Sequence, residues 1–438
     1  MFIPDRIQSV LISTLITGSI LFGYAVHANG PKPQAAQPQA EILHWWSSAG
    51  ESAALNVFID EFKARGGHYY DSTKNNQYAT REEAIDRMSK GYPSTLTQWN
   101  AGRDIAEFYD FGLIDAITEP SLVAKLKKLV PEPVLDAVTH RGEIIAMPIN
   151  VHTENWMWHS TNLIKQSSDL FTRDWQNFLT LGKDLEKQNV PLLAVGDQPW
   201  QVRILFTSIF LGISRDVYRE FYLAAEESAV ERPEFKEVLT AFSNFARYSK
   251  SFGDGNWNTQ VKAVADNQAG ATFMGDWAKG EFQVLGKTAG KDYGCLLTAS
   301  DDPGLLLVID SFILGKVDIP EERQGQALML DVVSDPSVNL QFNSLKGSVS
   351  PYNKPTSESL DACSTQVYDI LSNKEAVLPP YASYGDAGYM HLLDSEIYDL
   401  WKESQQTSDV DALVAASMKN FRKLLRAQQQ ESLATAEE

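Results

Sequence analysis

The stretch EILHWWSSAGESAAL (41–55) joins the end of an apolar strand to the start of an amphipathic helix. Residues 41–46 are predicted to form a strand, so Trp45 and Trp46 point to opposite sides of it. Across residues 51–63 the apolar side chains recur at helical spacing on one face. A strand, a loop and a helix in this order form the first half of an α/β unit.

The same alternation returns along the chain and indicates the fold class. Apolar runs predict strands at 143–151, 191–195 and 305–314, and helical periodicity predicts helices at 175–188 and 323–333. This alternation is typical of α/β proteins with mostly parallel sheets and helices on both faces. Ligands of such sheets bind outside the carboxyl ends of the strands, so the tandem tryptophans are predicted to lie at a ligand site.

The composition is that of a globular protein with an acidic balance. Of the 438 residues, 43% are hydrophobic and 22% are charged, which allows two lobes with separate cores. The formal net charge is −19, which disfavours contact with phosphate backbones and anionic lipids. We therefore expect no nucleic acid as a partner.

The N-terminus has the pattern of an export signal. Residues 7–26 are nearly uncharged and rich in Leu and Ile, and Val26-His27-Ala28 has small residues where a signal peptidase cleaves. We interpret residues 1–28 as a cleaved signal peptide and residues 29–40 as a linker, with a retained membrane anchor as the alternative. A lipoprotein anchor is excluded because no cysteine follows directly after the apolar stretch.

The chain has two cysteines, Cys295 and Cys363. In a reducing compartment they would be two unrelated buried thiols, whereas an even pair in an exported protein more often forms a bridge. We predict a disulfide bond between them.

Tryptophan is the residue type that points to a ligand. Eight of the ten tryptophans lie in short clusters, nearly all beside Asn, Gln, Asp or Glu, and only Trp175 and Trp401 stand apart. An indole stacks on the apolar C–H face of a pyranose, and amides and carboxylates satisfy its hydroxyl groups. Core packing explains any single tryptophan better, but the repeated polar neighbours favour carbohydrate binding.

Catalytic and metal chemistry have weaker support. Glu51, Glu154, Asp276 and Asp310 could supply the two carboxylates of a glycosidase, but hydrogen bonding or helix capping explains each of them better. The histidines lack metal-ligand spacing, and the chain has no GxSxG motif. The GKT at 286–288 is one residue out of register for a P-loop. We therefore expect no catalytic residue, no metal and no cofactor.

Eight short motifs follow one another along the chain: HWWSSAGE (44–51), MPINVHTENWMW (147–158), GDQPWQ (196–201), NWNTQVKAV (256–264), FMGDWAKGEF (273–282), GKDYGC (290–295), IDSFIL (309–314) and LKGSVSPY (345–352). In this order they resemble the extracellular solute-binding proteins that serve ABC sugar importers. The resemblance is closest to the periplasmic glucose/mannose-binding branch of Gram-negative bacteria. It spans roughly residues 41–390, nearly the whole mature chain.

The resemblance implies an α/β, two-lobe Venus-flytrap fold of the type II-like kind, with the ligand cleft between the lobes. One lobe would comprise residues 41–149 and 308–351, and the other residues 150–307 and 352–438. The resemblance further implies a periplasmic monomer that is not an enzyme, binds a glucose- or mannose-like sugar and docks on an inner-membrane ABC permease. This branch also carries a cysteine pair, which strengthens the disulfide prediction.

The resemblance also assigns ligand-binding residues. Trp45 and Trp46 resemble the stacking pair, while Asp310 and Lys346 resemble an acceptor and a donor for ring hydroxyls. The complete predicted set is Trp45, Trp46, Glu51, Gln98, Asn100, Asn150, His152, Trp200, Gln201, Trp257, Asp276, Trp277, Asp310 and Lys346.

Three departures from the family pattern leave the identity of the sugar open. Asn100 stands in place of a Lys or His, residues 377–389 lack a histidine, and residues 69–84 replace a Gly-rich strand. Two alternatives therefore stay open: a secreted glycoside-acting enzyme, and a sugar receptor that reports to a signalling sensor.

Overall fold

The computed structural model describes residues 37–165, 175–297, 304–352, 361–371, 376–378 and 387–436. The predicted signal peptide and most of the predicted linker lie outside these residues. Among the helices of the described ranges, none is long and apolar enough to cross a membrane.

The first sheet is built around β1 (Gln39–His44), which begins and ends two residues earlier than the predicted strand. β1 is parallel to β2 (His68–Thr73) and to β3 (Leu96–Asn100). β15 (Asp310–Gly315) lies beside β3 and is antiparallel to it. Two further strands pair antiparallel with β15, namely β4 (Ile114–Asp115) and β7 (Met147–Pro148). The helices of this region are α1 (Ala49–Ala64), α2 (Gln77–Ser89), α3 (Arg103–Asp110), α4 (Pro120–Leu129), α5 (Glu132–Ala137), α13 (Pro320–Val333) and α14 (Pro336–Lys346).

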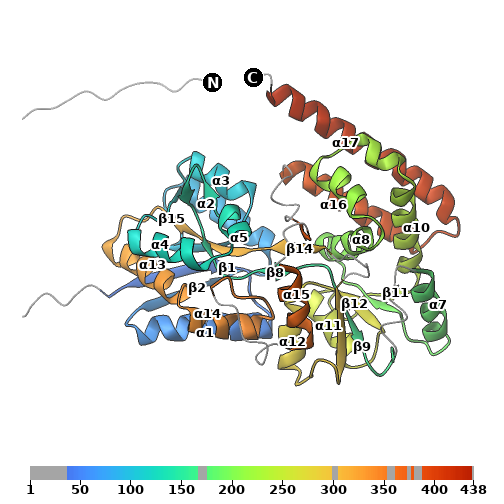
Figure 1. The fold of residues 1–438 in the computed structure, drawn as a ribbon, viewed down its shortest axis with the longest axis horizontal. Coiled ribbons are helices and arrows are strands. Elements are labelled where there is room, and N and C mark those ends of the chain that lie inside the picture. Colours follow the sequence, from blue (N-terminus) through green and yellow to red (C-terminus); the bar gives the residue numbers. More distant parts are fainter. Residues whose placement is uncertain are drawn as a thin grey trace, which may run out of the picture. The chain divides into compact units, whose positions relative to one another are not determined.

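α1 buries the apolar face that the sequence predicts. Phe58 and Phe62 are fully buried, and the ring of Phe58 stacks on Phe342 of α14 with 4.3 Å between the centroids. Each such side chain contributes about 1.5–3 kcal/mol by leaving water. The two helices consequently lie side by side below the first sheet in the view of Figure 1.

The second sheet has the strand order β11-β10-β12-β9-β13. β10 (Leu193–Ala194) is parallel to β11 (Ser249–Lys250) and β12 (Ala271–Phe273), whereas β9 (Trp156–Ser160) is antiparallel to β12 and β13 (Tyr293–Leu297). The helical segments of this region are α7 (Trp175–Glu186), α8 (Pro199–Ile213), α9 (Arg215–Tyr218), the π-helix η1 (Arg219–Leu223), the 3₁₀-helix η2 (Glu227–Glu231), α10 (Pro233–Arg247), α11 (Trp257–Ala265), α12 (Ala278–Val284), α15 (Ala362–Leu371), α16 (Ala387–Ser404) and α17 (Val410–Ala436).

A third, small sheet joins the chain segments that run between the two large ones. It consists of β8 (His152–Thr153), β14 (Leu305–Val308) and β16 (Val377–Leu378). The prediction of one strand over 305–314 is therefore wrong, because β14 and β15 belong to different sheets and are separated at Ile309.

The predicted strand at 143–151 is likewise divided. β6 (Glu143–Ile144) forms a hairpin with β5 (Thr139–His140), and β7 pairs with β15 of the first sheet.

Both large sheets are mixed, which corrects the prediction of mostly parallel sheets. A parallel neighbour requires a long crossover, usually a helix. No helix lies between β14 and β15, and β15 runs antiparallel to its neighbour β3 in the first sheet. The prediction of the α/β fold class is confirmed.

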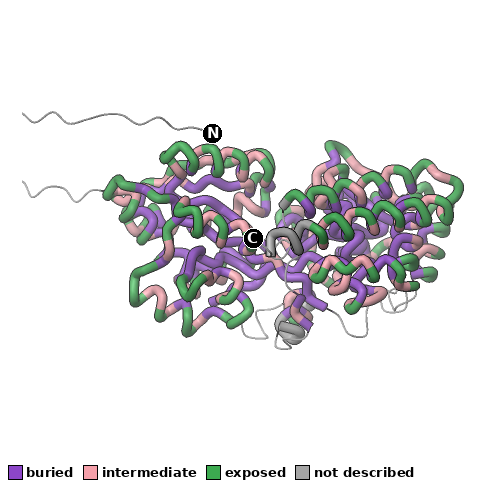
Figure 2. Tube along the Cα trace, turned by 90° about the horizontal axis from the view of Figure 1, so that it is seen from above, coloured by how far each residue is buried: buried purple, intermediate pink, exposed green. Residues whose placement is uncertain are grey.

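The buried residues are concentrated on the strands and on the inner helices (Figure 2). α8 is the clearest case, because all residues from Gln201 to Gly212 are buried. A helix that is apolar around its whole circumference must be enclosed by others. α10 and α16 pack against it, and Phe206 stacks on Phe421 of α17.

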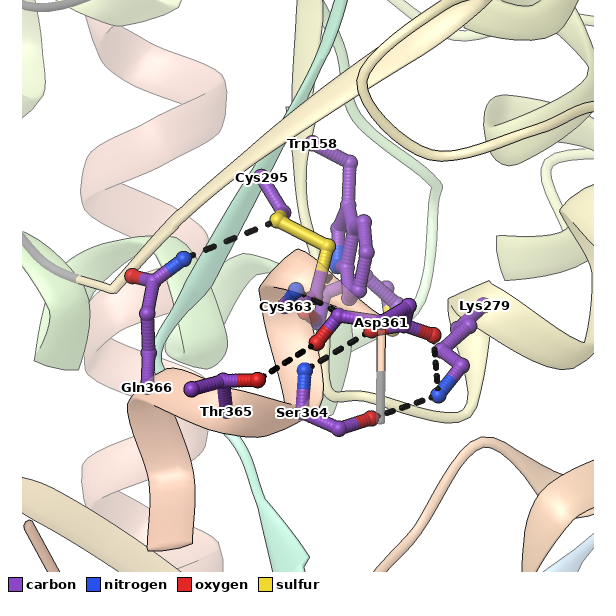
Figure 3. The surroundings of a disulfide bond; sticks show 9 residues. Trp158, Lys279, Cys295, Asp361, Cys363, Ser364, Thr365 and Gln366 are labelled. Carbon is purple, nitrogen blue, oxygen red and sulfur yellow. Dashed lines mark hydrogen bonds and ion pairs between the residues drawn. A yellow bond between two sulfur atoms is a disulfide. The ribbon is translucent and has the colours of Figure 1, made fainter. Parts of the chain in front are cut away.

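The predicted disulfide is confirmed. Cys295 of β13 and Cys363 of α15 are bonded, and their Cα atoms lie 5.9 Å apart. Figure 3 shows the surroundings, where Lys279 of α12 forms an ion pair with Asp361 at 2.6 Å. The bridge and this ion pair together fix the start of α15 beside the second sheet.

Candidate ligand-binding site

A cavity of about 470 Å³ lies at the carboxyl ends of strands from both large sheets. Its walls include the loops that follow β1, β2, β10, β11 and β12, the ends of β3 and α14, the start of β15, and residues of α2 and α16. Ten predicted residues line it, namely Trp45, Trp46, Glu51, Asn100, His152, Trp200, Trp257, Trp277, Asp310 and Lys346.

The tandem tryptophans take different environments. Trp46 is only 2% exposed and packs against Phe312 and Phe342, with centroids 6.1 and 5.5 Å away. Trp45 is partly exposed, and its backbone N–H donates to the Gln98 side-chain oxygen at 3.1 Å. Trp46 is therefore mainly a core residue with an edge at the cavity, while Trp45 presents more of its surface.

The N-terminus of α1 carries a capping box. The Ser48 hydroxyl accepts from the Glu51 backbone N–H at 3.2 Å, and the Glu51 carboxylate accepts from the N–H groups of Ser47 and Ser48, both also at 3.2 Å. The other Glu51 oxygen accepts from Lys346 Nζ at 3.0 Å. The carboxylate predicted as a ligand contact thus also caps the helix and anchors a lysine.

Lys346 is placed by the end of α14. Gly347 follows it with φ 92°, a left-handed conformation suited to glycine, and a Cβ there would lie 2.4 Å from the Asp276 carbonyl oxygen. The Lys346 ammonium lies 5.8 Å from the centroid of the Trp46 ring and 6.0 Å from that of Trp277. The lysine therefore connects the walls contributed by the two large sheets.

Asp310 is the centre of a buried hydrogen-bond network. Its carboxylate accepts from the side-chain amides of Asn100 and Asn150, each at 2.9 Å, and from Gln98 at 3.4 Å. His152 Nε2 lies 3.2 Å from it. A carboxylate offers about four acceptor positions, so these contacts fix the orientation of Asp310 at the cavity wall.

His152 links this network to Asp276. Its Nδ1 contacts the Asp276 carboxylate, and its Nε2 faces Asp310. Burial alone lowers the pKa of His152, but the charge of Asp276 and the hydrogen bonds to both aspartates outweigh it and raise the pKa above 6.5. Burial alone raises the pKa of Asp310, yet the hydrogen bond to His152 and the charges of His152 and Lys346 hold it below 3.8.

Three indoles follow three neighbouring strands of the second sheet. Trp200 lies in the first turn of α8 after β10, Trp257 begins α11 after β11, and Trp277 lies in the turn after β12. All three are partly exposed, and the rings of Trp200 and Trp277 have centroids 6.4 Å apart. Because the carboxyl ends of parallel strands meet at one edge of a sheet, the sheet order brings these residues together.

Four predicted residues are not among those that line the cavity. Gln98 and Asn150 hold Asp310, Asp276 holds His152, and the Gln201 side chain donates to the Gly255 carbonyl at 3.3 Å. These four residues do not line the cavity themselves but contact residues that form or adjoin its wall.

The comparison with known families settles what kind of protein this is. The model of the family "Bacterial extracellular solute-binding protein" matches residues 58–359. The chain belongs to this family. Solute-binding proteins bind rather than transform their ligands, so the chain is not an enzyme.

Two curated relatives of this solute-binding protein are each named "Probable sugar-binding periplasmic protein". The one from Brucella melitensis is 27% identical over 361 residues, which cover 82% of this chain and 84% of the relative. The one from Rhizobium meliloti is 28% identical over 331 residues, which cover 75% and 80%.

Solved structures confirm the fold of the solute-binding protein. The bacterial solute receptor AcbH, described with an exclusive preference for β-D-galactopyranose, is 15% identical with a TM-score of 0.71 and covers 91% of this chain and 99% of its own. A chitin oligosaccharide binding protein is 14% identical with a TM-score of 0.72 and covers 89% and 99%. The two large sheets with their helices are consistent with the two-lobe fold.

Sequence reasoning missed part of the cavity of this solute-binding protein. Asn75 and Asn76 before α2, and Gln77 and Tyr78 at its start, line the cavity and belong to the departure at 69–84, which was the only signal for them. Other missed lining residues are Ser47, Ser48, Arg81, Ala101, Asp104, Gln198, Arg203, Asn256, Asn258, Val308, Met390, His391 and Asp394.

The four carboxylates considered for a glycosidase all have protein partners. Glu51 pairs with Lys346, Asp276 and Asp310 flank His152, and Glu154 faces Arg203 at 3.7 Å. No group of three or more His, Cys, Asp or Glu side chains in the described ranges could hold a metal ion.

Proposed function

We propose that this solute-binding protein is the periplasmic component of an ABC sugar importer, and that it binds a neutral, glucose- or mannose-like mono- or small oligosaccharide. One observation carries the proposal: partly exposed indoles and a fixed carboxylate–ammonium group line the same cavity. The names of the curated relatives point to the same ligand class.

The binding mode follows from the chemistry of the walls. Trp45, Trp200, Trp257 and Trp277 offer ring faces to the C–H face of a pyranose, each worth roughly 0.5–1.5 kcal/mol beyond area burial. Asp310 accepts from ring hydroxyls and Lys346 donates to them, both with charge-assisted hydrogen bonds. A ligand hydroxyl most readily replaces the longest contact of Asp310, that from Gln98.

We further propose that residues 41–149 with 308–351, and 150–307 with 352–438, act as the two lobes and close on the sugar. The protein would act as a monomer after removal of its signal peptide and deliver the sugar to an inner-membrane permease. Residues 298–303, 353–360 and 379–386, which include most of the histidine-free stretch, lie outside the described residues.

Tryptophan fluorescence of the purified mature protein tests the ligand class. Titration with glucose, mannose and galactose is expected to give a saturable change with at least one sugar, because indoles line the cavity. Glucose 6-phosphate serves as the anionic control and is expected to bind far more weakly, since acidic side chains share the cavity. Preferential binding of the phosphate ester would contradict the proposal.

A further inference from the structure

A second charged group lines the cavity apart from Asp310 and Lys346. The Arg203 guanidinium, on α8, lies 3.0 Å from Asp394 of α16 and 3.7 Å from Glu154. The side chains of all three are less than 10% exposed. Burying a guanidinium is costly unless carboxylates neutralise it. Glu154 and Asp394, which come from two other segments of the chain, supply these carboxylates.

The group has the same chemistry as the proposed sugar contacts. A sugar hydroxyl both donates and accepts, so it is satisfied best where a donor and an acceptor lie side by side. Lys346 with Glu51 and Asp310 provides one such place, and Arg203 with Asp394 provides another. The planar guanidinium offers five N–H donors in a fixed geometry, which suits hydroxyls of defined stereochemistry.

An aromatic ring lines the cavity together with the donor–acceptor pair of Arg203 and Asp394. Tyr78 of α2 lines the same cavity as Arg203 and Asp394 and is 51% exposed. A half-exposed tyrosine offers a ring face to a sugar and a hydroxyl to its rim. An aromatic face beside a donor–acceptor pair is thus present twice in one cavity.

We propose that Tyr78, Arg203 and Asp394 form a second sugar subsite, and that the preferred ligand is a disaccharide. The inference rests on the proposed function and narrows it. The cavity volume of about 470 Å³ lies within the roughly 300–1,000 Å³ range of sites for drug-sized ligands, which are larger than a single hexose ring.

Matched monosaccharides and disaccharides test the subsite by calorimetry. The probes are glucose with maltose, cellobiose and trehalose, and galactose with lactose and melibiose. At least one disaccharide is expected to bind roughly tenfold tighter than its parent hexose, because a second ring adds an aromatic contact and charge-assisted hydrogen bonds. Disaccharides that all bind no tighter than the hexoses would overturn the inference.

The variant Tyr78→Ala removes the aromatic face without touching the Asp310 network. It is expected to weaken the preferred disaccharide roughly tenfold and the hexose less than about twofold. The matched control is Tyr92→Ala, which removes a tyrosine of similar exposure, 52%, outside the cavity. An equal effect of Tyr78→Ala on both ligands, or no effect on either, would overturn the inference.

Asp394→Asn provides a second, conservative test of the charged pair. It keeps the shape of the side chain but weakens its acceptor, so selective loss of disaccharide affinity with unchanged hexose affinity is expected. Loss of both affinities in the folded variant would contradict a separate subsite. If no neutral sugar binds the wild-type protein at all, the proposed function fails and the subsite fails with it.

Discussion

Trp45 and Trp46 illustrate how neighbouring residues of one type acquire different roles. Both lie just beyond the end of β1, where the predicted strand alternation no longer applies, and packing against Phe312 and Phe342 makes Trp46 the core residue. The sequence predicts the pair but not this division. Polar neighbours in the sequence likewise do not distinguish a core tryptophan from one at the site. Three tryptophans of the polar-flanked clusters are at most 1% exposed, namely Trp99, Trp156 and Trp158.

Alanine substitutions separate the two indoles. Trp46→Ala is expected to lower the free energy of unfolding by about 3–5 kcal/mol, because it empties a packed site. Trp45→Ala is expected to weaken sugar binding roughly tenfold with a much smaller loss of stability. Urea unfolding and fluorescence titration of both variants measure this. Equal stability losses would show that the assignment of the two roles is wrong.

His152 makes stability depend on pH in a definite direction. Its pKa is raised above 6.5 in the folded state, so its contribution is fully present below about pH 6.5 and is lost as the pH rises through the folded-state pKa. The charged groups that act on it are Asp276, Asp310, Lys346 and Glu154. Asp310, with its lowered pKa, contributes above pH 3.8 and loses its contribution as the pH falls through its folded-state value.

His152→Gln isolates this effect. The midpoint of thermal unfolding of the wild-type protein, relative to the variant, is expected to decrease as the pH rises from 6 to 9. Subtracting the variant removes the contributions of other histidines, such as His44, whose pKa burial lowers. A difference between the two proteins that does not change with pH would contradict the charged state of His152.

The elements show which parts of the fold local patterns can predict. The unit of β1 and α1 is predicted because a short apolar run is followed directly by a helical pattern with one apolar face. The capping box at Ser48 and Glu51 was not predicted. The apolar run from 305 to 314 contains no local sign of its division at Ile309, because each half is buried in a different sheet. The second subsite was missed for a related reason: Tyr78, Arg203 and Asp394 are far apart in the sequence and meet only in the fold.

The disulfide stabilises the connection between β13 and α15. Its cysteines are separated by 68 residues, so replacing both with serine is expected to lower the free energy of unfolding by about 2–4 kcal/mol. Urea unfolding with and without a reductant measures this. The reductant should destabilise the wild-type protein and leave the double variant unchanged. A wild-type protein insensitive to full reduction would contradict a stabilising role.

We expect a neutral sugar to bind in the cavity that residues from both large sheets line. This cavity is assembled from parts that no single motif contains: β3 and β15 bring Asn100 beside Asp310, while three strands of the second sheet bring their tryptophans to one edge. The family explains why such an assembly exists, since its members bind solutes. Which sugar is bound depends on the arrangement of the polar groups in the cavity.

Isothermal titration calorimetry of the mature protein and of Asp310→Asn tests whether this cavity binds a neutral sugar. The wild-type protein is expected to bind one neutral hexose or small oligosaccharide per chain. The variant, with its folded state checked by thermal unfolding, is expected to lose at least tenfold in affinity because a charge-assisted acceptor is gone. A folded wild-type protein that releases no binding heat with any neutral carbohydrate, or a variant that binds as tightly as wild type, would contradict the account.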